Sequence, residues 1–532
     1  MSSIRSKARC ALLAALGFAV TSFAPFSPVQ ADEPALFQAL QFEAELEEDS
    51  QQKVSPVGYN AFSPTLFDEP AEADAEVSDT VPREDYEKLM ERIGSLEESW
   101  EKYQDKLASD AAAKKKKPSY KLNGRIHLDN WNFTDTDPGI NFLETGDPTD
   151  DPEDRWDFRR IRLTWSGTVP NNMLFRTQID FNNPRTPEIK DVYFGFNNLP
   201  HNQTLLIGNQ KRPIGMDHLN SSRHNVFAER PLAVETFNED ARRLGVCMYG
   251  YSPDEMFNWR YGLFMLENIS TDGRYRGDYD QGGIYGRLAS SPWYDEISGG
   301  RGYYHFAISG SANTTDGDGN LDNDQNNNEA RFRTRPEARS DSRWWNTNRI
   351  LGATDYQQIG LESCLNIGAL QITGEYFGNW VQRRATGGFN GDNLTFHGGY
   401  IFASYFLTGE HIPLKRTSGT IDRVKPFENF FLVDRCRGGC GKGWGALAVA
   451  MRYSYLDLSD SDIRGGRGYS CTAGLNWYWT AYSKLQTNLV WGQIKDGGQG
   501  QSNGGPDGET QPLAAGVDGN YTILGFRYMI DF

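Results

Sequence analysis

Arginine is the residue of this sequence whose side chains, by their number and positions, could bind anions. Residues 118–532 contain 33 Arg and only 8 Lys. A guanidinium group is planar and offers paired N–H donors to an oxyanion, whereas an ammonium group is a compact point charge. The bias therefore indicates a protein that handles anions, provided that the fold gathers several arginines in one place. The alternative is that the arginines pair with neighbouring acids and create no anion preference.

The strands that would position these arginines are visible as a two-residue alternation. At the C-terminal end, Leu524, Phe526, Tyr528, Ile530 and Phe532 share one phase, and mostly polar residues share the other. Successive side chains of a strand point to opposite faces, so one face here is apolar and aromatic. In a chain with an export signal, this pattern favours a membrane barrel over a soluble β-sandwich, with the apolar side toward lipid and the polar side toward the lumen.

Similar alternation recurs from Tyr120 onward and predicts an all-β transmembrane barrel of about 16 antiparallel strands over residues 118–532, a number common in porins. No apolar run of about 20 residues, the length of a helical span, follows the N-terminus. The longer polar insertions, notably Asn313–Arg349, are expected to be external loops. Seven arginines fall on the polar phase of their strands: Arg160, Arg162, Arg176, Arg260, Arg287, Arg452 and Arg527.

The N-terminal region divides into a signal and an acidic extension. Residues 1–31 are typical of a secretory signal peptide, because Arg5, Lys7 and Arg9 precede the apolar run Ala11–Val20 and a small-residue cleavage site. Residues 32–81 are acidic and rich in proline, so we expect them to be disordered. Export and a barrel together predict the outer membrane, with this extension in the periplasm.

Residues 82–113 carry the clearest helical pattern. Apolar residues spaced alternately by three and four form one seam: Tyr86, Leu89, Ile93, Leu96, Trp100, Tyr103 and Leu107. This is the heptad pattern of a coiled coil. Aromatic side chains need more room than a tight dimer gives, so the seam favours a homotrimer. The alternative is a single amphipathic helix that lies on another surface.

Six short stretches combine in a way that resembles one protein family. They are Phe158-Arg159-Arg160, Gly208–Gly215, Ser221–Arg223, Ala228–Arg230, Tyr405–Glu410 and Val424–Phe427. Together with the heptads before the barrel, they resemble the phosphate-selective porin O and P family. The first stretch matches that family's arginine-bearing strand, the second matches the strand end before its constriction loop, and the next two match the loop itself.

The resemblance implies a trimeric, anion-conducting outer-membrane barrel whose narrow lumen is lined by arginines. Carried over by position, it implies an anion pathway at Arg159, Arg160, Lys211, Arg212, Arg223 and Arg230. The polar phase of the strands adds Arg162 and Arg176. Three departures from the family bear on phosphate specificity. His224 stands where an aromatic residue is common, the net charge of the barrel is acidic, and an external loop is larger.

Two further constellations could bind metal or form a disulfide. Oxygen ligands with the spacing of a calcium loop occur at Asp318, Asn320, Asp322, Asp324, Asn326 and Glu329. Asn323 stands where glycine is usual and no helices flank the loop, so the alternative is a solvated acidic loop. Cys436 and Cys440 are close enough for a disulfide in an oxidising compartment. We expect no other cofactor.

These patterns predict a porin for passive diffusion of small anions, phosphate or polyphosphate among them. Its expected partners are outer-membrane lipid, small inorganic anions and two further copies of the chain, but no nucleic acid. One alternative is an unselective porin, and another is a structural barrel that anchors the coiled coil to the cell wall. We expect no enzyme, because the sequence contains no nucleophile elbow, phosphate loop or metal-ligating His pair. A barrel lipase, whose Ser and His need share no local motif, stays an alternative.

Overall fold

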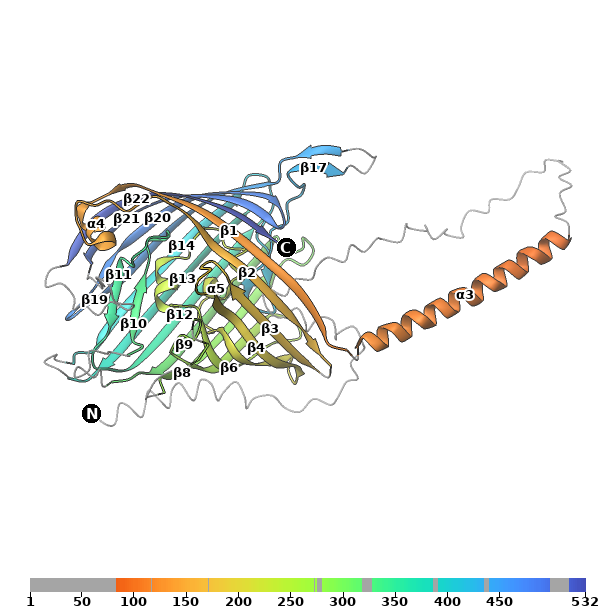
Figure 1. Cartoon of the computed structure of the whole chain (residues 1–532), viewed down its shortest axis with the longest axis horizontal. Helices are drawn as coiled ribbons and strands as arrows, with labels where there is room; N and C mark the ends of the chain where they lie inside the picture. The colour runs from red at the N-terminus through yellow and green to blue at the C-terminus, as the bar shows by residue number, and fades with distance from the viewer. Residues whose placement is uncertain are drawn as a thin grey trace. The chain divides into compact units, whose positions relative to one another are not determined.

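The computed structural model describes residues 83–115, 117–170, 172–271, 273–274, 280–317, 328–385, 391–434, 440–497 and 516–532. Within these residues, sixteen antiparallel strands close into a barrel in which each strand pairs with its neighbours in chain order (Figure 1). The predicted barrel and its strand number are confirmed.

The bounds of the barrel strands follow in ring order. They are β1 (Ser119–Thr136), β2 (Arg155–Val169), β3 (Met173–Asp180), β4 (Glu188–Leu199), β5 (Gln203–Lys211), β6 (Arg242–Tyr251), β7 (Phe257–Met265), β8 (Gly282–Tyr294), β9 (Gly302–Thr314), β12 (Ala353–Ile367), β13 (Leu370–Arg383), β14 (Leu394–Phe406), β19 (Ala446–Asp460), β20 (Ile463–Thr480), β21 (Ser483–Gly497) and β22 (Val517–Asp531).

The C-terminal strand closes the ring as its alternation predicts. Tyr528 and Ile530 are 40% and 51% exposed, whereas Arg527 and Asp531, in the other phase, are only 1% and 3% exposed. The terminal Phe532 exchanges two backbone hydrogen bonds with Gly124, at 2.7 and 3.0 Å. A Cβ atom on Gly124 would lie 2.4 Å from the Phe532 ring, so glycine leaves room for that ring. The apolar phase therefore faces outward and the charged phase faces the lumen.

Several connections between strands contain structure of their own. The β1–β2 connection holds α4 (Pro138–Thr145), and the β5–β6 connection holds α5 (Met216–Leu219) and α6 (Leu232–Phe237). The β9–β12 connection holds the pair β10 (Arg331–Thr334) and β11 (Trp345–Arg349). The β14–β19 connection holds β15 (Leu414–Lys415) with β16 (Thr420–Ile421), and β17 (Phe431–Asp434) with β18 (Cys440–Gly443).

A helix, α3 (Arg83–Lys115), covers the segment with the heptad pattern. Four of its seam residues, Ile93, Leu96, Trp100 and Tyr103, are 40%, 64%, 61% and 54% exposed. Association of this helix with two further copies stays a prediction. No helix among the described residues is both long enough and apolar enough to cross a lipid bilayer.

Other predictions concern residues that the structure does not describe. The signal peptide (1–31), the acidic segment (32–81), Cys436 and five of the six predicted calcium ligands lie outside the described residues. Those ligands are Asp318, Asn320, Asp322, Asp324 and Asn326. Cys440 contributes its backbone to β18.

Candidate anion pathway in the barrel lumen

The connection between β5 and β6, residues 212–241, runs through the interior of the barrel, and nearly all of its residues are buried. Glu375 on β13 accepts hydrogen bonds from the backbone N–H groups of Met216, at 2.8 Å, and Asp217, at 2.7 Å. Lys484 on β21 donates to the carbonyl oxygen of Asn225 at 2.7 Å. Since β13 and β21 lie far from β5 in the ring order, the connection crosses the lumen.

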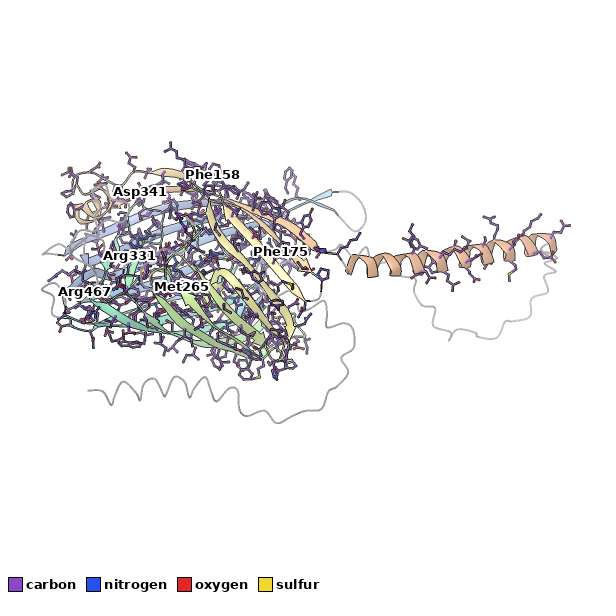
Figure 2. The ribbon with its side chains drawn as sticks, turned by 60° about the horizontal axis from the view of Figure 1, so that its bottom comes forward. Phe158, Phe175, Met265, Arg331, Asp341 and Arg467 are labelled. Atoms are coloured by element: carbon purple, nitrogen blue, oxygen red, sulfur yellow. The ribbon has the colours of Figure 1, made fainter. Side chains whose placement is uncertain are left out.

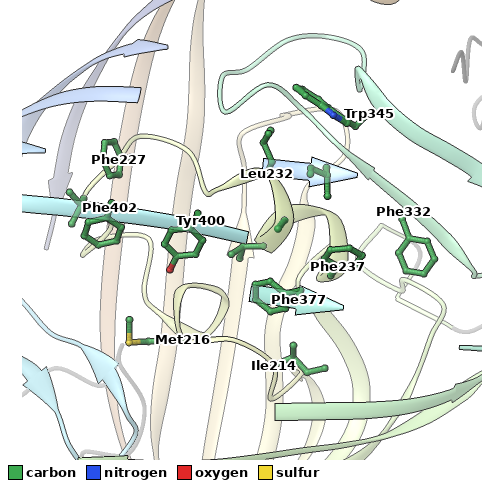
Figure 3. Close-up of a cluster of buried hydrophobic side chains, with 14 of the residues drawn as sticks. Ile214, Met216, Phe227, Leu232, Phe237, Phe332, Trp345, Phe377, Tyr400 and Phe402 are labelled. Carbon is green, nitrogen blue, oxygen red and sulfur yellow. The ribbon is translucent and has the colours of Figure 1, made fainter. Parts of the chain in front are cut away.

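Aromatic packing holds this connection in place. The ring of Phe227 meets Phe402 of β14 edge to face, with centroids 5.7 Å apart. Phe237 of α6 packs on Phe377 of β13 at 6.1 Å and on Phe332 of β10 at 6.0 Å. Figure 3 labels these five rings and shows Phe237 beside Phe377 and Phe227 beside Phe402. Burial of each such ring contributes roughly 1.5–3 kcal/mol, so the connection is a fixed part of the channel wall.

The described part of the β9–β12 connection also turns inward, which corrects the expectation that 313–349 is an external loop. Residues 328–350 are mostly buried. Glu337 accepts hydrogen bonds from Arg452 of β19 at 2.6 Å and from Thr472 of β20 at 2.8 Å. Phe332 and Trp344 are 3% and 0% exposed. The expectation was wrong because these large apolar side chains, in a segment of high average polarity, are stabilised by burial inside the barrel.

These two inward connections and the β2–β4 wall enclose a cavity of about 250 Å³. Eleven cationic side chains line it: Arg159, Arg160, Arg162, Lys190, Lys211, Arg230, Arg242, Arg333, Arg335, Arg339 and Arg343. Six acidic side chains line it too: Asp180, Glu188, Glu229, Glu235, Glu239 and Asp240. The lining therefore carries more positive than negative charge, although the chain as a whole has a net charge of −17.

Several of the lining arginines are bound to acids. Arg159 donates to both carboxylate oxygens of Glu229, at 2.7 and 3.1 Å. Arg162 donates to Asp180 at 2.6 Å. Glu229 also accepts a hydrogen bond from Arg527 of β22 at 2.6 Å. These contacts fix the guanidinium groups in place, and the two carboxylates, Glu229 and Asp180, together offset two positive charges.

Other lining arginines carry the surplus of positive charge. Within the described part of the chain, no carboxylate lies within hydrogen-bonding distance of Arg160, Arg335 or Arg339. The ring nitrogen of His127 lies 3.5 Å from Arg160, an oxygen of Asp157 lies 3.7 Å from Arg339, and Arg335 donates to the carbonyl of Ser340 at 2.8 Å.

The connections also set the ionisation of nearby groups. Burial lowers the pKa of Arg335, and the neighbouring Arg339 and Arg343 lower it further. A bound anion would relieve this crowding of cations. Burial alone would raise the pKa of Glu239, but Arg333, Arg343 and Arg331 outweigh it and hold the pKa below its usual value. Glu239 is therefore ionised and balances part of the positive charge of the β9–β12 connection.

The predicted pathway residues divide into two groups. Arg159, Arg160, Arg162, Lys211 and Arg230 line the cavity. The other three predicted residues are not in its lining and bind elsewhere: Arg176 lies 3.5 Å from Asp191, Arg212 donates to the carbonyl of Glu239 at 3.0 Å, and Arg223 lies 3.3 Å from Asp531.

Four arginines that the β9–β12 connection brings to the cavity were not predicted from the sequence, namely Arg333, Arg335, Arg339 and Arg343. A signal was present, because Arg331, Arg333 and Arg335 alternate with other residues as on one face of a strand. The residues looked like a polar loop because nothing in their own pattern shows that the loop folds inward.

No group of acids, histidines and cysteines suited to a metal ion occurs among the described residues. Of the predicted calcium ligands, Glu329 is described, and Arg349 donates to it at 3.0 Å. Among the described residues, Cys247, Cys364 and Cys471 are not in disulfides.

Comparison with known proteins gives a family match over most of the chain. The model of the family described as phosphate-selective porin O and P matches residues 121–517. An uncharacterized protein of Caulobacter vibrioides is 26% identical over 332 residues, which are 60% of this chain and 59% of that protein. The match thus spans less than two thirds of that relative's length.

Solved porins are similar at low identity. The anion-selective porin from Comamonas acidovorans has a TM-score of 0.43 and 12% identity, over 78% of this chain and 100% of that chain. The outer-membrane channel DcaP of Acinetobacter baumannii has a TM-score of 0.44 and 9% identity, over 78% of this chain and 98% of that chain.

Proposed function

Because the chain belongs to the phosphate-selective porin O and P family, we propose that it is an outer-membrane porin through which small anions, phosphate or polyphosphate among them, diffuse passively. The observation that carries this proposal is the lining of the cavity, with eleven cationic and six acidic side chains. An arginine can present two N–H donors to one oxyanion, so this lining suits phosphate-like solutes better than cations.

The arrangement of the lining supports passage along the wall. Three lining arginines come from β2 (Arg159, Arg160 and Arg162), and four come from the β9–β12 connection (Arg333, Arg335, Arg339 and Arg343). In the proposed pathway, an anion would pass between these two sets of arginines. Conduction requires that an ion bind favourably enough to enter the pathway, and that several sites share the ion so that it can also leave.

A second candidate, an unselective porin, is favoured by the paired charges. Arg159 pairs with Glu229, and Arg162 pairs with Asp180. Such pairs create an electric field across the lumen but favour neither anions nor cations. The two candidates differ in the zero-current potential of purified protein in planar bilayers under a salt gradient. Anion preference at moderate salt supports the proposal, and no preference or cation preference supports the unselective porin.

The assembly that we propose is a trimer held by the α3 helices in the periplasm. It is supported by the exposed seam of Leu96, Trp100 and Tyr103, which a coiled coil would cover. A structural role, in which α3 and the acidic extension contact the cell wall, is the alternative for a barrel that does not conduct. Calcium binding by residues 318–329 and the disulfide between Cys436 and Cys440 stay proposals as well. The family and the fold point to a channel rather than an enzyme.

A further inference from the structure

Glu144 ties the β1–β2 connection to the arginine-bearing connection between β9 and β12. Its side chain is 3% exposed. Its carboxylate accepts hydrogen bonds from the backbone N–H groups of Asp341, at 2.6 Å, and Ser342, at 3.1 Å. It also accepts from the hydroxyl of Ser342, at 2.9 Å, and from the indole N–H of Trp344, at 2.8 Å. Four donors from one short segment thus converge on one carboxylate.

Glu144 itself is held firmly. It lies in α4, which begins at Pro138 and ends before Gly146, whose φ of 87° is left-handed. Ile140 and Leu143 of this helix are 0% and 4% exposed. A Cβ atom on Gly139 would lie 2.0 Å from a carbonyl oxygen of β22, so α4 packs directly on that strand. The carboxylate is therefore a fixed point relative to the barrel wall.

The segment bound by Glu144 is the one that carries cavity arginines. Arg343 lies between Ser342 and Trp344, both of which donate to Glu144. Arg335 donates to the carbonyls of Ser340, at 2.8 Å, and Asp341, at 3.3 Å, so its position also depends on this segment. Figure 2 labels Asp341 and Arg331, which mark the course of this connection. Glu144 is absent from the cavity lining.

We propose that Glu144 is a positioning residue for anion selectivity: it holds the 341–344 segment so that Arg335, Arg339 and Arg343 face the cavity. The inference rests on the proposed function of that cavity. For loss of the Glu144 carboxylate, this proposal predicts a change in anion preference opposite to the change that the lost charge alone would cause. Removal of an acid near an anion pathway should, by its charge alone, favour anions. Loss of the hydrogen bonds from Glu144 to the 341–344 segment should instead weaken the anion preference, because the three arginines would move away from the cavity.

Three substitutions separate these effects. Glu144→Gln removes one charge, and its amide cannot accept at both positions, because one oxygen is replaced by an NH₂ donor that faces an N–H donor. Ser342→Ala removes the hydroxyl bonds to Glu144 and to the carbonyl of Leu143 without changing any charge. Glu235→Gln is the matched control, since Glu235 lines the cavity and its side chain makes no hydrogen bond or ion pair in the described part of the chain.

The readouts are the anion-to-cation permeability ratio in bilayers and the phosphate concentration that half-blocks the chloride current. We expect Glu144→Gln to lower the ratio and raise the half-blocking concentration, each by roughly three- to tenfold. Ser342→Ala should move both in the same direction by less, and Glu235→Gln should raise the ratio. Heat-modifiable migration in gels verifies that each barrel is folded.

The proposal is overturned if Glu144→Gln raises the permeability ratio as Glu235→Gln does, or if neither Glu144→Gln nor Ser342→Ala changes it. A Glu144→Gln barrel that does not fold leaves the decision to Ser342→Ala alone. A wild-type channel without anion preference refutes the proposed function. Even in that case, a shift of the permeability ratio toward cations in Glu144→Gln would support the positioning role of Glu144, so the two proposals are tested separately.

Discussion

Replacement of Arg339 by Gln removes one positive charge from the cavity lining and no hydrogen bond of the described residues. An oxygen of Asp157 lies 3.7 Å from the Arg339 guanidinium, beyond hydrogen-bonding distance, and the side chain is 28% exposed. The substitution therefore changes the charge of the pathway with little change in its packing. The amide of Gln keeps the substituted side chain polar.

The size of the effect follows from the distance between an anion and the guanidinium. Two unit charges 4 Å apart interact with about 1 kcal/mol in bulk water and about 4 kcal/mol at an effective dielectric constant of 20. The cavity is lined by charged groups and Asp157 offsets part of the attraction, so the lower figure applies. A loss of about 1 kcal/mol is roughly a fivefold fall in the anion-to-cation permeability ratio.

The assay is the zero-current potential of single channels or small ensembles in planar bilayers under a potassium chloride gradient. The matched control is Arg464→Gln, which changes the net charge of the chain by the same amount. Arg464 is 45% exposed in its side chain, pairs with Asp496 and does not line the cavity. We expect its permeability ratio to stay close to that of the wild type.

Salt concentration gives an internal check on the Arg339 prediction. The Debye length falls from about 8 Å at physiological salt to about 3 Å at 1 M, so the difference between wild type and Arg339→Gln should shrink at high salt. If Arg339→Gln and Arg464→Gln shift the ratio equally, net charge rather than the cavity governs selectivity and the reasoning is refuted.

Three further predictions follow from the proposed pathway and assembly. Arg339→Lys should keep the preference for chloride but weaken block by phosphate, because an ammonium group cannot form the paired hydrogen bonds of a guanidinium; an unchanged half-blocking phosphate concentration would show that geometry is irrelevant there. Deletion of residues 81–113 should convert a trimer into monomers in native mass spectrometry of protein in mild detergent; a monomer both before and after deletion excludes the coiled coil. Non-reduced peptides should show Cys436 linked to Cys440 with a mass two hydrogens lower; two freely alkylated thiols in protein isolated without reductant would contradict this.

The barrel could be predicted from the sequence because its signal is local. Leu524, Phe526 and Ile530 alternate with Arg527 and Asp531, and the same rule that places their side chains on opposite faces holds in every strand. The arginines of β2 were found for the same reason. Arg160 and Arg162 belong to the polar phase of their strand, and in a membrane barrel the polar phase faces the lumen.

The inward connections could not be predicted in this way, because their direction depends on partners far away in the sequence. Arg335 and Arg343 reach the cavity because Glu144, about 200 positions earlier, accepts hydrogen bonds from Asp341, Ser342 and Trp344. Arg223, conversely, was assigned to the pathway by resemblance, but it lies against Asp531 of the last strand. Neither partner is visible from the residues around the arginine.

An acidic chain and an anion pathway are compatible because selectivity depends on where charges lie. Residues 118–532 hold 49 acidic and 41 basic residues, so the barrel segment is itself negative. Charges more than about 8 Å from a permeating ion are largely screened at physiological salt, which leaves the choice of ion to the cavity lining. There, Asp180, Glu229 and Glu239 bind arginines, whereas Arg160 and Arg339 have no carboxylate within hydrogen-bonding distance among the described residues. Acids outside the cavity repel arriving anions and so act on the rate of capture. In the proposed pathway, the arginines without such a carboxylate would act on which ion passes.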